Sequence, residues 1–172
     1  YTPQGSGMFS LGNTYVNASA SNCFVLPPPE DNLESIFDTA KSMARIYAMR
    51  GGVGHDISNL RPAGAPTNNA AKTSTGAFSF MDFFSYVTGL IGQAGRRGAL
   101  LLSMRVDHPD IFSFIKVKRD LDKKGFFDVL KDNGVNINDY EWSSIADRLK
   151  SVSNANISVK LTDKFINAVK ED

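Results

Sequence analysis

The stretch 21-SNCFVLPPPEDNLESIF-37 places a short apolar run, three prolines and an acidic helix start in immediate succession. Residues 23–26, CFVL, predict a short buried strand, which ends at Pro27 because proline cannot donate to a strand ladder. A helix is expected to begin near Asp31 or Asn32, since either side chain can cap free backbone N–H groups. This succession of strand and helix is typical of α/β folds.

Helical periodicity continues beyond this stretch. Gly51 and Gly52 are expected to end the first helix, and residues 1–20 and 51–77 predict loops because they are rich in turn-forming residues. The buried stripe of the first helix is expected to consist of Leu33, Ile36, Phe37, Ala40, Met43, Ala44 and Tyr47.

The later segments keep the same alternation. A helix dense in aromatic residues is expected over 78–94, and 96-RRGALLLSMRV-106 predicts a strand buried on both faces. A third helix is expected over 108–118, a strand over 155–161 and a capped helix over 162–172. This order implies an α/β architecture with parallel strands. The third helix is expected to direct inward Ile111, Phe114 and Ile115.

The composition fits a soluble globular protein and excludes several classes. Of the 172 residues, 42% are hydrophobic and the net charge is +1, which gives no general attraction to nucleic acid or to anionic membranes. No apolar run approaches the ~20 residues of a membrane span. A single cysteine cannot form an internal disulfide, which favours a reducing, cytoplasmic setting. The chain lacks an initiator methionine and stops inside a predicted helix, so we expect a segment of a longer protein.

The residues alone leave the chemistry of that cysteine, Cys23, open. A lone cysteine at the start of an apolar run is usually buried packing. The alternative is a redox or radical thiol at a strand end, where α/β folds display reactive groups. Composition does not decide between the two interpretations.

Two glycine-containing stretches are further candidates. The loop 51-GGVGHDISNLRPAGAP-66 would let backbone N–H groups approach a ligand, and Arg61 carries a fork of donors that suits phosphate. The simpler interpretation is a helix cap followed by a turn, with Arg61 solvated; the loop matches neither the P-loop nor the GxGxxG pattern. Arg96 and Arg97 are either solvated charges or phosphate contacts.

The two histidines predict no metal centre. His108 precedes a proline at a helix start and is expected to be structural, whereas His55 lies in the glycine loop and is a candidate for ligand contact. No cysteine and histidine cluster has metal-ligand spacing, so no metal site is predicted. The aromatic helix at 78–86 is expected to be core or a subunit interface, because no basic residues interleave its rings.

Five blocks of sequence follow one another in a distinctive order. They are SNCFVLPPPEDNLESIF, RGGVGHDISNLRPAGAP, TGAFSFMDFF, QAGRRGALLLSMRVDHPDIFSFIKVKRD and NANISVKLTDKFINAV. In order and spacing they resemble the catalytic subunit of ribonucleotide reductase, over roughly residues 8–120 and 154–170. The blocks are most similar to the adenosylcobalamin-dependent branch, and branches with a separate radical-generating subunit share much of them.

The resemblance implies both a fold and a reaction. The fold is the early, incomplete part of a ten-stranded α/β barrel, in which crossover helices join parallel strands. The reaction is the radical reduction of ribonucleotides to 2′-deoxyribonucleotides. In this family the cysteine of the S-x-C block is one of two thiols that reduce the ribose 2′ carbon, and Cys23 matches it. The partner thiol is not in this chain, so the chain alone is expected to be inactive.

The resemblance also implies a substrate site around this thiol. Ser21 and Asn22, together with the turn at Gly51 and Gly52, resemble backbone that lies against the substrate nucleotide.

A second implied site binds the allosteric effector nucleotide. Asp31 matches a residue that touches the effector ribose, and Arg61 matches a residue of the first specificity loop that reaches the effector phosphates. A second loop, about residues 150–156 here and including Asn154, is expected between effector and substrate.

Cofactor and partners follow from the same resemblance. The complete enzyme is expected to use adenosylcobalamin or, alternatively, a separate radical-generating subunit; no motif in this chain binds a cofactor covalently. Expected partners are a ribonucleotide, a dNTP or ATP effector, a thioredoxin-type reductant and the complementary remainder of the catalytic subunit. A homodimer through the helices near the effector loop is also implied. No nucleic acid or membrane partner is expected.

One segment departs from the family pattern. Residues 120–153, which predict short helices at 126–131 and 139–150, are longer than this family usually has there. We therefore expect residues 1–172 to form a partial barrel domain that carries an insertion, either a private subdomain or a partner surface. Two other functions stay open: a nucleotide-binding regulatory module without catalysis, and a structural α/β domain in which Cys23 is packing.

Overall fold

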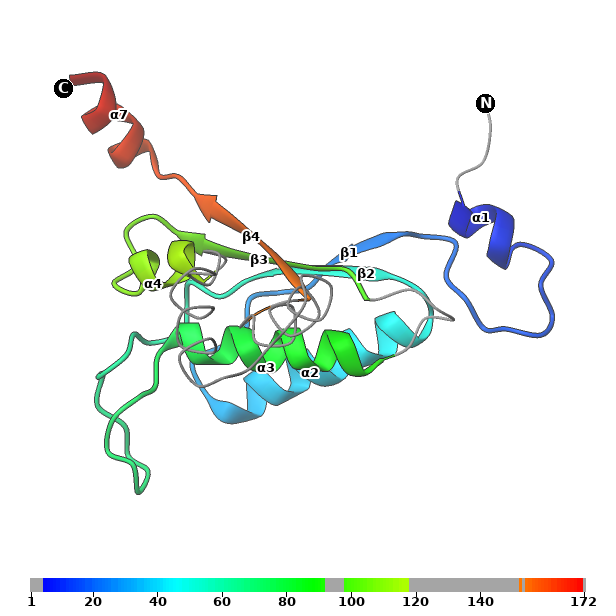
Figure 1. Cartoon of the computed structure of the whole chain (residues 1–172), viewed down its shortest axis with the longest axis horizontal. Helices are drawn as coiled ribbons and strands as arrows, with labels where there is room; N and C mark the ends of the chain where they lie inside the picture. Colours follow the sequence, from blue (N-terminus) through cyan, green and yellow to red (C-terminus); the bar gives the residue numbers. More distant parts are fainter. Residues whose placement is uncertain (1–4, 92–97, 118–151, 153, 172) are drawn as a thin grey trace, which may run out of the picture.

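Four parallel strands form one sheet, and they neighbour one another in chain order, β1-β2-β3-β4 (Figure 1). The computed structural model describes residues 5–91, 98–117, 152 and 154–171. The predicted α/β architecture with parallel strands is confirmed. The strands are β1 (Cys23–Val25), β2 (Gly52–Asp56), β3 (Leu100–Arg105) and β4 (Ala155–Lys160). The helices are α1 (Gly5–Ser10), α2 (Leu33–Ala48), α3 (Ala77–Leu90), α4 (Ile111–Lys116) and α7 (Asp163–Glu171).

Helices α2 and α3 lie side by side and cover one face of the sheet (Figure 1). The strand residues on this face pair in rows, and one row joins Val53, Leu100 and Ala155, all of them buried. Successive strand residues point to opposite faces, so the alternate row of Gly54, Leu101 and Asn156 lies on the other face. We call this second face the open face. The core therefore sits between the sheet and the two helices.

The burial of β1 and β3 differs from the sequence prediction. Both strands were expected to be buried, β3 on both faces. In the structure Leu100, Leu102 and Met104 are buried against the helices, whereas Leu101 on the open face is 46% exposed. Cys23 and Val25 of β1 are likewise exposed on the open face. A continuous apolar run does not reveal which face lacks cover, because both faces carry similar side chains.

Helix α2 forms where the sequence predicts it. The Asn32 side chain accepts a hydrogen bond from Ser35 N at 2.8 Å, which caps the first turn. The expected stripe is only partly confirmed, because Leu33 and Phe37 are 58% and 57% exposed. They lie on the flank of the helix, where the Phe37 ring contacts Phe83 of α3 at 4.9 Å between centroids. The residues of α2 that are buried are Ile36, Ala40, Met43 and Tyr47.

Two elements were not predicted at all. Residues 5–10 form the short helix α1 instead of loop, and β2 lies in the middle of the sheet within the stretch predicted as loop. Two of the five residues of β2 are glycine, which has a low strand propensity and hides the pattern. Close packing explains the neighbouring glycine: a Cβ atom on Gly51 would lie 2.5 Å from Ile46 Cγ2 and 2.7 Å from Phe24 Cε2.

This packing gives a testable contrast between two glycines. Gly51→Ala is expected to lower the free energy of unfolding by about 1–3 kcal/mol, because the new methyl group overpacks the junction of α2 and β1. Gly54→Ala is the matched control, since its Cβ would meet Leu101 at an ordinary 3.7 Å. Urea unfolding of both variants checks this, and equal stability of the two would contradict it.

The remaining described elements agree with the predictions in type. Helix α3 covers most of the predicted span, β4 and α7 form as expected, and Thr162 caps α7 by accepting from Phe165 N at 3.3 Å. In α4, Ile111 and Phe114 are buried, but Ile115 is exposed and not inward-facing as expected. The expected insertion and its two short helices lie outside the described residues, apart from Val152. Within the described part, no helix is long and apolar enough to span a membrane.

Candidate functional site

The thiol of Cys23 is exposed at the first residue of β1, on the open face of the sheet. Its Cα pairs with that of Gly52 in β2, and Gly52 N donates to the Asn22 carbonyl oxygen at 2.7 Å. Ser21 precedes these residues and is also exposed. The structure thus gathers Ser21, Asn22, Cys23 and Gly52 at the amino ends of two adjacent strands. We call this group the thiol end.

The N-terminal segment packs beside the thiol end. The hydroxyl of Ser6, in α1, hydrogen bonds the side-chain oxygen of Asn22. The Arg50 guanidinium lies over the Phe9 ring, 3.8 Å from its centroid, a cation–π contact. Helix α1 is thereby fastened next to the residues that resemble a substrate site, a placement that the sequence did not predict.

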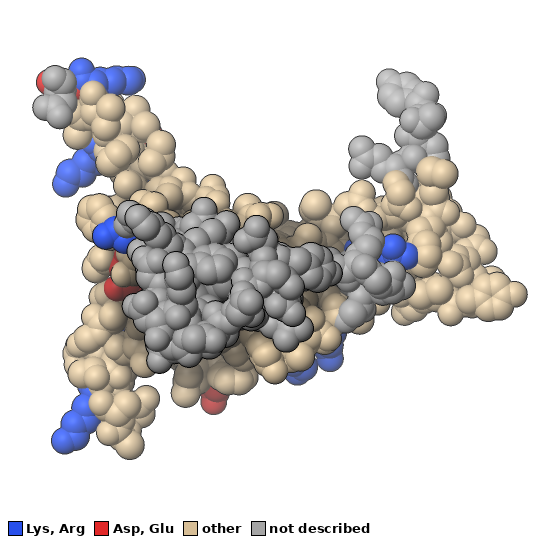
Figure 2. Space-filling view, viewed as in Figure 1, with Lys and Arg blue, Asp and Glu red and all other residues tan. Residues whose placement is uncertain are grey.

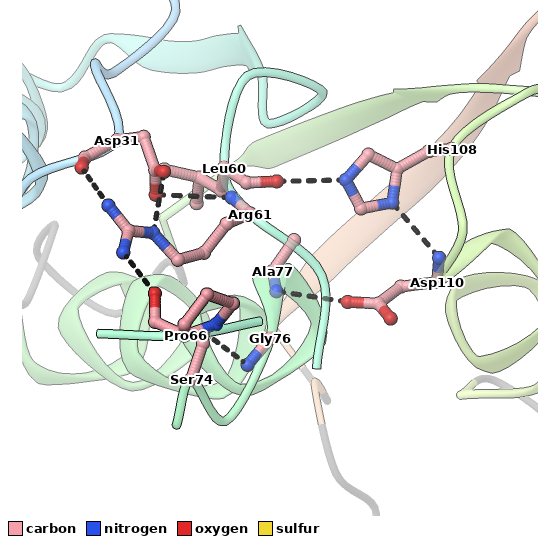
Figure 3. Close-up of polar contacts among 9 residues, drawn as sticks. All are labelled: Asp31, Leu60, Arg61, Pro66, Ser74, Gly76, Ala77, His108 and Asp110. Carbon is pink, nitrogen blue, oxygen red and sulfur yellow. Dashed lines mark hydrogen bonds and ion pairs between the residues drawn. The ribbon is translucent and has the colours of Figure 1, made fainter. Parts of the chain in front are cut away.

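Asp31 and Arg61 form the centre of a second region, although 30 positions separate them. Arg61 Nε donates to Asp31 Oδ2 at 2.6 Å, and the Arg61 backbone N donates to Asp31 Oδ1 at 3.1 Å (Figure 3). Arg61 Nη1 also donates to the Pro66 carbonyl at 2.9 Å. The guanidinium is therefore neither simply solvated nor wholly free for phosphate, because part of its donor fork is already engaged.

Residues 64–76 form a projecting hairpin, which we call the arm (Figure 1). Backbone bonds from Gly64 N to the Ser74 oxygen at 2.9 Å and from Thr67 N to the Lys72 oxygen at 2.9 Å hold its two sides together. The sequence predicted this segment only as loop. Its many polar residues gave no sign of the pairing between the two sides.

A cavity of about 410 Å³ opens between the arm and α2. Asp31 and Arg61 line it, together with apolar side chains of Leu33, Ile36 and Phe80. The arm contributes hydroxyl and amide side chains, and these belong to Thr67, Asn68, Asn69, Thr73, Ser74 and Thr75. An apolar wall that faces convergent polar groups is the usual make-up of a small-molecule site.

Asn154 does not join this cavity. It is not among the described lining residues, and its side-chain Nδ2 donates to the Ser85 carbonyl of α3 at 3.2 Å. Its backbone N donates to Ser85 Oγ at 3.0 Å. Asn154 thus fixes the start of β4 against α3. Lys150, Ser151 and Ser153 of the expected second loop, like Arg96 and Arg97, lie outside the described residues.

Both histidines are buried, in contrasting surroundings. His108 bonds the Leu60 carbonyl through Nε2 at 2.8 Å and accepts from Asp110 N through Nδ1 at 3.0 Å, so its expected structural role is confirmed. His55 lies in β2 and is 3% exposed, edge-on to Phe84 with ring centroids 4.6 Å apart. Among the described residues neither of its ring nitrogens has a partner. His55 therefore lines neither region, and its contact with a ligand stays a prediction.

Charged side chains influence the histidines and the two regions only at short range. Burial lowers the pKa of His55 to about 4, although the neighbouring Asp56 carboxylate acts in the opposite direction. On the face shown in Figure 2, lysine and arginine side chains of the described part lie at separate places and form no single basic patch. No group of three or more potential metal ligands occurs among the described residues.

Comparison with known proteins identifies the chain. The family model of the ribonucleotide reductase barrel domain matches residues 21–172. The chain belongs to the ribonucleotide reductase family. Its four parallel strands are accordingly part of a ribonucleotide reductase barrel, which confirms the expected fold class.

Curated relatives of this ribonucleotide reductase chain support the assignment. It is 32% identical over 162 residues to the vitamin B12-dependent ribonucleotide reductase of Rhodopirellula baltica, covering 93% of this chain and 15% of that protein. It is 32% identical over 173 residues to the vitamin B12-dependent ribonucleoside-diphosphate reductase of Thermoplasma acidophilum, covering 100% of this chain and 19% of that protein. The chain thus spans less than a fifth of the length of these relatives.

A solved structure shares the fold. The class Id ribonucleotide reductase alpha subunit of Actinobacillus ureae superposes with a TM-score of 0.63 at 16% identity. The match covers 94% of this chain and 24% of that subunit.

Proposed function

We propose that the chain is part of the catalytic subunit of a vitamin B12-dependent ribonucleotide reductase, an oxidoreductase that makes 2′-deoxyribonucleotides. Family membership and the named relatives support this assignment. The observation that carries it is the exposed Cys23 thiol at the end of a barrel strand, beside the backbone of Gly52. The ribonucleotide binds at the thiol end, against Ser21, Asn22 and the glycine turn.

Cys23 supplies reducing equivalents in this proposal. Cys23 and a second thiol, from the remainder of the subunit, together give up two protons and two electrons and join in a disulfide. The ribonucleotide loses its 2′ oxygen as water and gains hydrogen at that carbon. A thioredoxin-type dithiol then reduces the disulfide by exchange through a mixed disulfide. Exposure of Cys23 fits both steps, because each requires another sulfur to reach it.

The cavity beside the arm binds the effector nucleotide, a dNTP or ATP. Its volume of about 410 Å³ falls in the range of small-molecule sites. The apolar wall of Leu33, Ile36 and Phe80 suits a base, and the hydroxyl and amide groups of the arm suit sugar and phosphate. Arg61 uses its remaining N–H groups for phosphate, while its bonds to Asp31 and Pro66 hold the wall in place.

When bound to the complete enzyme, adenosylcobalamin would supply the radical. Among the described residues no histidine is accessible as a ligand for its cobalt, because His55 is buried against Phe84 and His108 uses both ring nitrogens. We place the residues that bind this cofactor in the remainder of the subunit. We place the protein in the cytoplasm, together with the reductant.

The subunit pairs with a second copy through the outer flank of α2 and α3. Phe37 is 57% exposed there and touches Phe83. Phe37→Asp is expected to raise the dimer dissociation constant about tenfold or more, since aromatic residues are frequent hot spots. Phe112→Asp, at an exposed phenylalanine on α4, is the control and leaves dimerisation unchanged. Sedimentation velocity measures both variants, and dimers of equal strength would contradict the pairing.

Reconstitution tests the function as a whole. The chain is combined with the complementary remainder of the subunit, adenosylcobalamin and a dithiol reductant, and deoxynucleotide formation is measured. We expect product only when all components are present. The cavity favours one other function, a regulatory module without catalysis. Binding of dNTP by a well-folded mixture that forms no product would favour that alternative.

A further inference from the structure

A carboxylate from a distant part of the chain holds the base of the arm. Asp110 lies just before α4, yet Asp110 Oδ2 accepts from Ala77 N at 3.1 Å. Both carboxylate oxygens also lie 3.2 Å from Ala63 N, which donates to them. Ala63 and Ala77 flank the arm on its two sides. One side chain therefore fastens both ends of a 13-residue hairpin, counted from Gly64 to Gly76.

The local geometry is arranged to receive this carboxylate. Helix α3 has Gly76 as its N-cap and no side-chain cap of its own, so Asp110 takes the place of that cap. Gly76 has a φ of +91°, which favours glycine, and a Cβ there would lie 2.7 Å from Asp110 Oδ2 and 2.8 Å from Ala63 N. Any other residue at this position would occupy the space that the carboxylate uses.

Asp110 is itself oriented from the core. Its backbone N donates to His108 Nδ1, and His108 Nε2 bonds the Leu60 carbonyl (Figure 3). Leu60 directly precedes Arg61, which bonds the arm at Pro66. These contacts link the segment that follows β3 to both sides of the arm. Of the residues that make them, only Arg61 lines the cavity.

We propose that Asp110 is a positioning residue of the nucleotide cavity. Its carboxylate fixes the two ends of the arm, and this sets where the hydroxyl and amide groups of the arm stand relative to α2. A wall that is ordered in advance loses less conformational entropy when a ligand binds, and its affinity is correspondingly higher. This inference rests on the proposed effector site. It adds Asp110, which lies outside the cavity, as a residue that controls the affinity of the cavity for nucleotide.

Asp110→Asn tests the proposal in the complete catalytic subunit. Asparagine keeps the size of the side chain but turns one accepting oxygen into an NH₂ group that faces backbone donors. We expect the dissociation constants of dATP, dGTP and dTTP, measured by calorimetry, to rise about tenfold. Amide exchange at Gly64, Thr67 and Ser74 should become faster, because these amides form the bonds across the arm. The rate of Cys23 alkylation should not change, since the thiol end is elsewhere.

Asp107→Asn is the matched control. Asp107 lies three positions earlier and pairs with Arg105 at the surface instead of with the arm. We expect unchanged nucleotide affinity and unchanged exchange in the arm. Three results would overturn the proposal: wild-type affinity in Asp110→Asn, unchanged arm exchange, or global unfolding of that variant alone.

Absence of the effector site and absence of the Asp110 role would give different results. If the unmodified subunit binds none of the three dNTPs, the effector site is wrong. Asp110 is then judged by amide exchange alone, and faster exchange confined to the arm still supports its fastening role.

Discussion

Cys23→Ser is expected to lower the turnover of the reconstituted enzyme by about 10³-fold or more, because removing a residue that carries the chemistry has effects of this order or larger. Serine fills nearly the same space, and its hydroxyl cannot form a disulfide. Because Cys23 is exposed at the end of β1, the substitution should leave the free energy of unfolding almost unchanged. Product formation under excess reductant and urea unfolding measure the two effects.

The control for this substitution lies on the same strand and face. Val25→Ala changes another exposed side chain of β1, two residues further on, and turnover should stay close to that of the unmodified enzyme. The ribonucleotide should still bind to Cys23→Ser with ordinary affinity, since no contact is lost before chemistry. Full turnover in Cys23→Ser would mean that the sulfur is inert and that the reductive role belongs elsewhere.

Acid is expected to destabilise the fold through His55. The pKa of His55 is about 4 in the folded chain, against an ordinary value of 6.5, because burial disfavours the charged ring. As the pH falls below 6.5 the unfolded chain binds a proton that the folded chain does not, so stability is lost progressively until about pH 4. The difference corresponds to about 3 kcal/mol at 1.36 kcal/mol per pKa unit.

His55→Leu isolates this effect from other titrating groups. Leucine keeps an apolar contact with Phe84 and cannot titrate, so the variant should retain the contributions of the carboxylates, including Asp56. Urea unfolding at pH 7 and pH 4 compares the two proteins. The loss between these values should be smaller in His55→Leu by about 3 kcal/mol. Identical losses would mean that His55 gains a proton as easily in the folded chain as in the unfolded one.

Short-range sequence patterns predicted the helices and strands whose formation depends mainly on residues close together in the chain. Helix α2 followed from the Asn32 cap and from apolar spacing, and β4 followed from alternation. Strand β2 was missed because Gly52 and Gly54 carry no side chain whose pattern could show. The residues around them instead show why a side chain fits poorly, since a Cβ on Gly52 would lie 3.2 Å from the Cβ of Ala99. Such a constraint is visible only once the strands are side by side.

Of the residues that line the candidate cavity, only Asp31 and Arg61 were predicted as site residues, and their contacts were not predicted. The resemblance selected Asp31 and Arg61, yet it assigned both to the ligand, whereas the structure shows them bonded to each other. Asp110 was expected only at the start of a helix, and its reach to Ala63, 47 positions away, has no local signal. Contacts of this kind depend on how β3 is placed beside β2, which a single sequence does not specify.

The pairing of Cys23 with Gly52 also limits how the gene can change. A strand alternates its faces with a period of two, so one inserted or deleted codon between Asn22 and Val25 would turn the sulfur toward α2 and α3 and away from the open face. The same event at the tip of the arm, near Asn69, would change the length of an exposed turn and leave every strand in register. Length variation among descendants of this sequence should therefore be purged from β1 because of strand register, whereas the limit at the tip of the arm is the cavity that Asn68 and Asn69 line.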